Sequence, residues 1–112
     1  MVLSKDQILK ADDLKTIDVE VEAWGGSVRL KMPSVRKKLE LRKFYEENED
    51  QFKRMSKVLS CCIVDESGDL QFTEEEIDKF LDKDLEVIEF VFNAASDLIG
   101  GTNESQDNAK KN

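Results

Sequence analysis

The sequence contains no histidine, and this absence excludes several kinds of active site. Without an imidazole there is no histidine base, no histidine-ligated metal and no Ser-His or Cys-His nucleophile pair. The chain also lacks a glycine-rich phosphate loop and a nucleophile elbow, and its acidic residues are too numerous to single out a catalytic dyad. We therefore predict a protein that is not an enzyme and that binds no cofactor or metal ion.

Cysteine is scarce as well, and the two cysteines, Cys61 and Cys62, are adjacent. They match no C-x-x-C metal or redox spacing, and a disulfide between neighbours would be strained. We interpret them as small apolar residues of a helix. The first residues include no apolar run of signal-peptide length, and no stretch approaches the length of a membrane span. These absences predict a cytoplasmic protein.

The chain of 112 residues has 17 basic and 25 acidic side chains, a formal charge of −8. This length suits a single domain, which we place at 1–100. Residues 101–112 are polar and without periodicity, so we expect a disordered tail. The negative charge disfavours binding to nucleic acid or to an anionic membrane. The expected partner is another protein.

The first third of the chain predicts a short helix near residues 4–14 followed by a β-hairpin. Ser4 and Gln7 have the spacing of a capping box that starts a helix. Apolar and polar residues then alternate on both sides of Gly25 and Gly26, which predicts a hairpin at about 17–32. A two-residue turn would pair residues whose numbers sum to 51. Trp24 would lie beside this turn, either partly covered by helices or exposed for a partner.

The rest of the chain has helical periodicity, so the predicted fold class is α+β and mostly α-helical, with four or so packed helices after the hairpin. The expected helical regions are about 34–64 and about 73–99. Ser34 is the expected cap of the first region, which we expect to be broken in the middle, with Asn48 as the candidate cap of its second half. Thr73 and Glu76 form a second capping box. The last helix is so apolar that it is either central in the core or covered on one face by a partner.

The segment 65–76 partly matches a calcium-binding loop, with acidic or hydroxyl side chains at the first, third, fifth and twelfth positions. Its sixth position, however, is Leu70, where the loop needs glycine, and Gly68 comes two places early. We interpret the segment as a glycine turn followed by a helix cap. Residues 65–89 hold eleven acidic residues and two lysines, so this region is strongly negative.

Several motifs together resemble the tail assembly chaperones of long-tailed bacteriophages, and the resemblance covers roughly residues 4–100. The most distinctive part is the Trp-Gly-Gly-x-Val hairpin. The motifs are Ile8-Leu9-Lys10-Ala11-Asp12-Asp13-Leu14, Val19-Glu20-Val21, Trp24-Gly25-Gly26-Ser27-Val28-Arg29-Leu30 and Gly68-Asp69-Leu70-Gln71-Phe72-Thr73, followed by the apolar last helix.

The resemblance implies a non-structural phage protein in the cytoplasm of the infected bacterium, absent from the mature virion. Its expected partner is the tape measure protein, which it keeps soluble before the tail tube forms. The resemblance also suggests the major tail tube protein, a second copy and a longer frameshifted form as partners. Lys110-Lys111-Asn112 is compatible with slippery codons, so the gene is expected to carry a slippery heptamer there.

A chaperone of this kind needs apolar surface for its client and charge for its own solubility. We expect the partner-binding residues on the outer side of the last helix, around Phe90, Val91, Leu98 and Ile99, together with Trp24. The alternative is a small acidic regulator, either a calcium sensor or a protein that binds a basic host protein.

Overall fold

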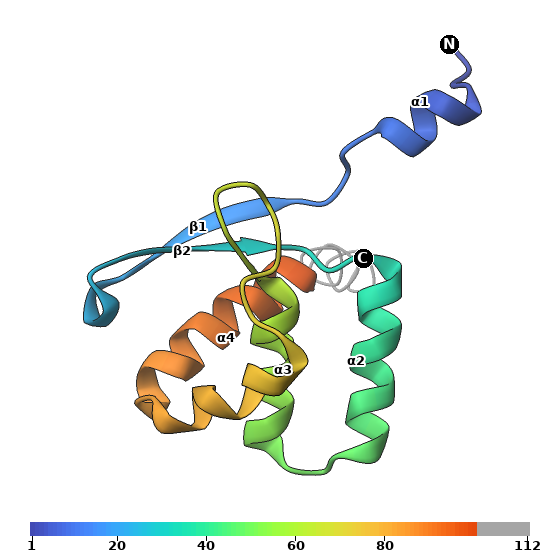
Figure 1. Cartoon of the computed structure of the whole chain (residues 1–112). Coiled ribbons are helices and arrows are strands. Elements are labelled where there is room, and N and C mark those ends of the chain that lie inside the picture. Colours follow the sequence, from blue (N-terminus) through green and yellow to red (C-terminus); the bar gives the residue numbers. More distant parts are fainter. Residues whose placement is uncertain (101–112) are drawn as a thin grey trace, which may run out of the picture.

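The computed structural model describes residues 1–100, and these form an α+β fold that confirms the predicted class (Figure 1). The predicted disordered tail, 101–112, lies outside the described residues. Within the described part, no helix is long and apolar enough to cross a membrane. The elements in order are α1 (Lys5–Lys10), β1 (Thr16–Val21), η1 (Glu22–Trp24), β2 (Gly26–Lys31), α2 (Val35–Glu47), α3 (Gln51–Cys62), β3 (Ile63–Val64), η2 (Glu74–Asp82) and α4 (Leu85–Ile99).

Helix α3 forms the centre of the core. Every residue from Met55 to Val64 is buried, because α2, η2 and α4 all pack against this helix and β3 continues from it into the sheet. Its buried hydroxyls are satisfied within the helix, since Ser60 Oγ donates to the Lys57 carbonyl at 2.7 Å. The buried Lys57 ammonium pairs with the Glu74 carboxylate. Within residues 1–100, polar residues therefore enter the core without leaving unpaired buried side-chain atoms.

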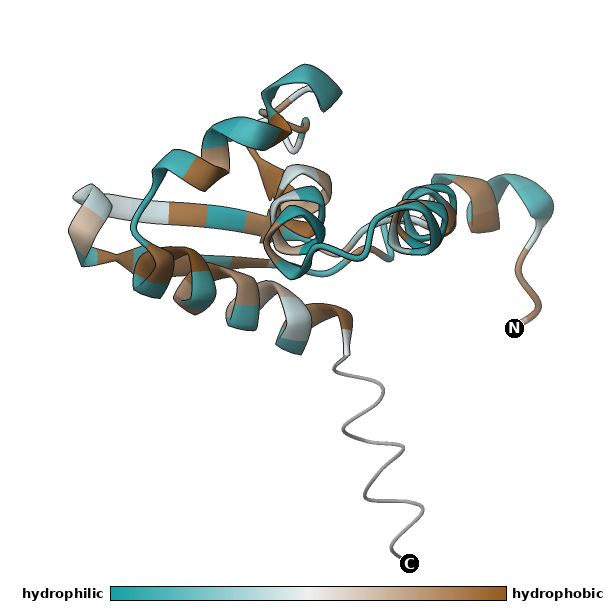
Figure 2. Cartoon of the chain, turned by 90° about the horizontal axis from the view of Figure 1, so that it is seen from below, coloured by the Kyte–Doolittle hydropathy of each residue, from teal (hydrophilic) through white to brown (hydrophobic). Residues whose placement is uncertain are grey.

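Helix α4 buries one face only, through Ile88, Val91, Ala95 and Leu98. It packs on α3 and under β1, and hydrophilic residues recur between its apolar ones (Figure 2). Of the two predicted roles for this helix, a central position in the core is therefore wrong. The other face of α4 is exposed at Phe90.

The hairpin exists, but its predicted register is wrong. Strands β1 and β2 pair residues whose numbers sum to 47, for example Ile17 with Leu30 and Asp18 with Arg29. The turn is longer than two residues, because 22–24 form a 3-10 turn that ends at Gly25 in the left-handed region, with φ +75°. The shift is an even number of residues, so the apolar side chains keep the predicted face. Leu30 is fully buried on that face.

Two boundaries in the helical region differ from the prediction. The break between α2 and α3 exists, but Asp50 caps α3, its carboxylate accepting from the amides of Phe52 and Lys53, while Asn48 ends α2. The predicted helix at 34–64 also ends early. Residues 63 and 64 form β3, which adds a third strand beside β2. The predicted caps at Ser34 and Thr73 are confirmed.

Helix α1 projects away from the packed body (Figure 1). The predicted capping box is confirmed, because Ser4 Oγ accepts from the Gln7 amide and Gln7 Oε1 accepts from the Ser4 amide. The helix ends at Lys10, earlier than the predicted residue 14, and none of its residues is buried. Helix α1 therefore forms an arm held by its own local bonds.

Candidate functional site

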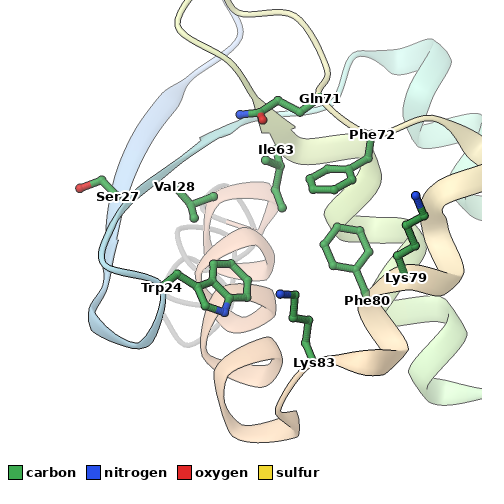
Figure 3. Close-up of a pocket in the computed structure, with 9 residues that line it drawn as sticks. All are labelled: Trp24, Ser27, Val28, Ile63, Gln71, Phe72, Lys79, Phe80 and Lys83. Atoms are coloured by element: carbon green, nitrogen blue, oxygen red, sulfur yellow. The ribbon is translucent and has the colours of Figure 1, made fainter.

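The hairpin turn, the loop after β3 and η2 enclose a pocket of about 360 Å³ (Figure 3). We call it the Trp24 pocket. Its volume lies within the roughly 300–1,000 Å³ of typical ligand sites. The lining residues are Trp24, Ser27, Val28, Ile63, Gln71, Phe72, Lys79, Phe80 and Lys83.

The turn between the strands places Trp24 at this pocket. Gly25 adopts a positive φ and donates its N–H to the Glu22 carbonyl at 3.0 Å, which closes the 3-10 turn that carries the indole. Trp24 keeps 36% of its surface exposed. The rest of the domain thus covers part of this residue, and part of its surface stays exposed.

Two phenylalanines form the opposite wall. The ring centroids of Phe72 and Phe80 lie 4.7 Å apart at an interplanar angle of 53°, a tilted aromatic pair. The capping box between them fixes the start of η2: the backbone N–H and the hydroxyl of Thr73 donate to Glu76 Oε1 at 3.0 and 3.1 Å. These hydrogen bonds lower the pKa of the Glu76 carboxyl.

A second apolar pocket, of about 370 Å³, lies between α3, η2 and the start of α4. We call it the Phe52 pocket. Phe80 and Lys83 line both pockets, so the two are neighbours. Three large apolar side chains here are about half exposed: Phe52 at 49%, Leu81 at 45% and Leu85 at 47%. The complete lining is Asp50, Phe52, Met55, Ser56, Phe80, Leu81, Lys83, Leu85 and Ile88.

This arrangement suits binding of apolar segments. Aromatic and aliphatic walls supply area for hydrophobic contact, and the lysines at the edge supply charge. The cysteines lie elsewhere, buried and free in α3, as the sequence predicts. Burial raises the pKa of Cys62 to about 12, so this thiol is protonated at neutral pH. No thiolate is available there for nucleophilic chemistry.

The structure separates the partner-binding residues that the sequence predicts. Trp24 lines the pocket named after it, whereas Phe90, 53% exposed, lines a different pocket beside the hairpin. Ile99 lines a groove between α2 and α4. Val91 and Leu98 are 0% and 8% exposed, so the prediction that they form an outer surface is wrong. They face the core because α4 turns this side toward α3.

The segment 65–76, which partly matches a calcium-binding loop in sequence, contains the predicted glycine turn. Asp65 Oδ1 accepts from the amides of Ser67 and Asp69 at 2.8 and 3.1 Å, and Gly68 has φ +87°. The Asp65 carboxylate is therefore engaged by its own loop. In the part of the chain that the structure describes, no three metal-ligating side chains come together.

Sequence reasoning missed most of the walls of both pockets. Phe52, Phe72 and Phe80 come from segments far from Trp24 in sequence. Only packing brings Phe72 and Phe80 to the Trp24 pocket, and Phe52 and Phe80 together at the Phe52 pocket. Helical periodicity does mark Phe80 and Leu81 as apolar positions of η2. It does not tell which of them is covered, and Phe80 is 6% exposed while Leu81 is 45% exposed.

No protein-family model matches the chain, and no curated protein matches it significantly in sequence. Among solved structures, the fold is similar to that of the bacteriophage HK97 tail assembly chaperone, with a TM-score of 0.64. The two are 20% identical, and the match covers 84% of this chain and 91% of the other. The resemblance predicted from the sequence is thus confirmed at the level of the fold.

Proposed function

We propose that this chain is a non-catalytic tail assembly chaperone of a long-tailed bacteriophage. In this role it binds the tape measure protein and keeps it soluble until the tail tube assembles. The observation that carries the proposal is the fold shared with the HK97 chaperone over nearly the whole length of both chains. Motifs in the hairpin and in the loop before η2 point the same way.

The surface chemistry supports the proposal. The Trp24 and Phe52 pockets together present apolar walls with several half-exposed side chains. Exposed apolar surface of this kind on a small domain favours protein contact. The formal charge of −8 favours solubility while such surface is exposed. The pockets are therefore the proposed place at which apolar segments of the client bind.

The remaining parts of the proposal follow from the same role. The protein acts in the cytoplasm of the infected cell and is absent from the finished virion. The tail tube protein, a frameshifted longer form and a second copy are further proposed partners. Phe90 and Ile99 remain predicted contacts, since both keep surface outside the core.

Co-expression with the tape measure protein of the same phage tests the proposal. We expect the client to move from the insoluble to the soluble fraction and to co-purify with this chain. Replacing Trp24, Phe52 and Leu85 by serine is expected to abolish this effect. Leu39→Ser is the matched control, because Leu39 is 54% exposed on α2 and lines neither pocket. A client that stays insoluble with the unaltered chain would refute the function.

A further inference from the structure

Among residues 1–100, the ionisable side chains that line the Trp24 pocket are two lysines, Lys79 and Lys83. This is unexpected from the local sequence, since η2 holds five acidic residues and one lysine. None of these five acidic residues lines the pocket, whereas the lysine of η2 and Lys83 directly after it do. In Figure 3 the Lys83 side chain extends toward the indole of Trp24, and Lys79 runs beside Phe80.

Neither lysine is firmly neutralised. Lys79 Nζ lies 3.8 Å from Glu76 Oε2 with 72% of its side chain exposed, an arrangement that contributes little. Lys83 takes part in none of the ion pairs found within residues 1–100. Its neighbour Asp84 is engaged elsewhere, because its carboxylate caps α4 by accepting from the Val87 amide at 3.2 Å. Within the described part of the chain, Lys83 thus has no ion-pair partner.

Lys83 also occupies a special place, because it lines both the Trp24 and the Phe52 pockets. Of the described residues, one acidic side chain lines the Phe52 pocket, that of Asp50, and its carboxylate already accepts from two backbone amides at the start of α3. A segment lying across both pockets would therefore meet apolar walls at its two ends and a cation in the middle.

A third pocket shows the opposite charge. Within residues 1–100, the pocket beside the hairpin that contains Phe90 is lined by no cation, and its ionisable lining residues are Glu20, Glu22, Asp84 and Glu86. An acidic client would be repelled there and attracted at Lys83. The pockets at Lys83 and the pocket at Phe90 are both partly apolar, but they differ in the sign of their charged lining residues.

We infer that Lys83, assisted by Lys79, selects client segments that carry a carboxylate between two large apolar side chains. One apolar side chain enters the Trp24 pocket, the other enters the Phe52 pocket, and the carboxylate pairs with Lys83. This inference rests on the proposed function and names the chemistry of the segment that the site accepts.

Trp24 gives a direct readout, because it is the only tryptophan of the chain and lines the site. The probes are two synthetic amphipathic helical peptides without tryptophan, identical except for a central Glu or Lys between two Phe residues. Titration at low salt, followed by Trp24 fluorescence, gives both dissociation constants. We expect the Glu peptide to bind at least about tenfold more tightly, because like charges face each other in the other complex.

Charge reversal completes the test. Lys83→Glu is expected to invert the preference, whereas Lys10→Glu, an exposed change of the same charge on the projecting α1, leaves it unchanged. Circular dichroism confirms that each variant is folded. Equal affinity of the two peptides, no binding of either, or an unchanged preference in Lys83→Glu would overturn the inference.

The test separates this inference from the proposed function. If the chain keeps the tape measure protein soluble but shows no charge preference, the selection by Lys83 is refuted and the chaperone role stands. If the peptides are discriminated but the client stays insoluble, the chaperone role is refuted while selection of acidic apolar segments by Lys83 is supported.

Discussion

Truncating Leu59 to alanine tests whether α3 is the centre of the core. Leu59 is 0% exposed, so the change removes fully buried methyl groups and leaves a cavity. Such replacements destabilise by about 2.7–5.0 kcal/mol. Phe90→Ala is the comparison: the side chain is 53% exposed, so about half of the roughly 1.5–3 kcal/mol for full burial is lost, or about 1 kcal/mol.

Urea unfolding monitored by circular dichroism measures both free energies, since small single domains usually unfold in one cooperative transition. For a domain of this size each kilocalorie shifts the melting temperature by roughly 4–8 °C, so thermal scans give an independent check. The Leu59 variant should melt at least about 10 °C below the unaltered chain. If Phe90→Ala costs as much as Leu59→Ala, the assignment of α3 as the central helix is refuted.

Three further predictions concern thiols, pH and register. Because burial raises the pKa of Cys62 to about 12, an aryl disulfide reagent at neutral pH should label it only as fast as the protein opens, and rapid labelling of the folded chain would contradict this. The pKa of Glu76 is lowered in the folded chain, so its ionised carboxylate stabilises the fold at pH values above about 4.5. This contribution is lost as the pH falls through the folded-state pKa. The difference in unfolding free energy between the unaltered chain and Glu76→Gln should therefore shrink when urea unfolding is measured in acid. Cysteines introduced at Glu20 and Ser27, which pair across the hairpin, should form a disulfide detectable by mass spectrometry. Cysteines introduced at Glu20 and Lys31 should not form one. The two-residue turn would have paired these two positions instead.

Local signals in the sequence predicted local structure well. The capping boxes at Ser4 and Thr73 and the cap at Ser34 use hydrogen bonds within a few residues, and all are present. The register of the hairpin failed because it depends on turn length. Gly25 and Gly26 look like a two-residue turn, but the chain folds 22–24 into a 3-10 turn first.

Features that depend on packing could not be predicted in the same way. A strand of two residues, Ile63–Val64, is too short for periodicity to reveal, and it continues an apolar helical pattern. Helix α3 looks less apolar than α4 because it includes Ser56, Lys57 and Ser60, yet it is the more buried. Those polar groups tolerate burial because carbonyl or carboxylate partners satisfy them.

For the site, the sequence identified Trp24 and its proximity to the turn. It did not identify Phe72, Phe80 or Lys83, because only the packing of η2 and its flanking residues against the rest of the domain brings them to the hairpin. It placed the partner surface on α4 by counting apolar residues, and the count includes the buried Val91.

The detached position of α1 has a consequence for the behaviour of the chain in solution. Six residues are fewer than the roughly 12–15 that an isolated helix needs to be stable in water. The arm therefore coils and uncoils independently of global unfolding, and its amide hydrogens should exchange with solvent long before those of α3. Proteases should cleave the connection near Ala11 first and leave the rest of the domain intact.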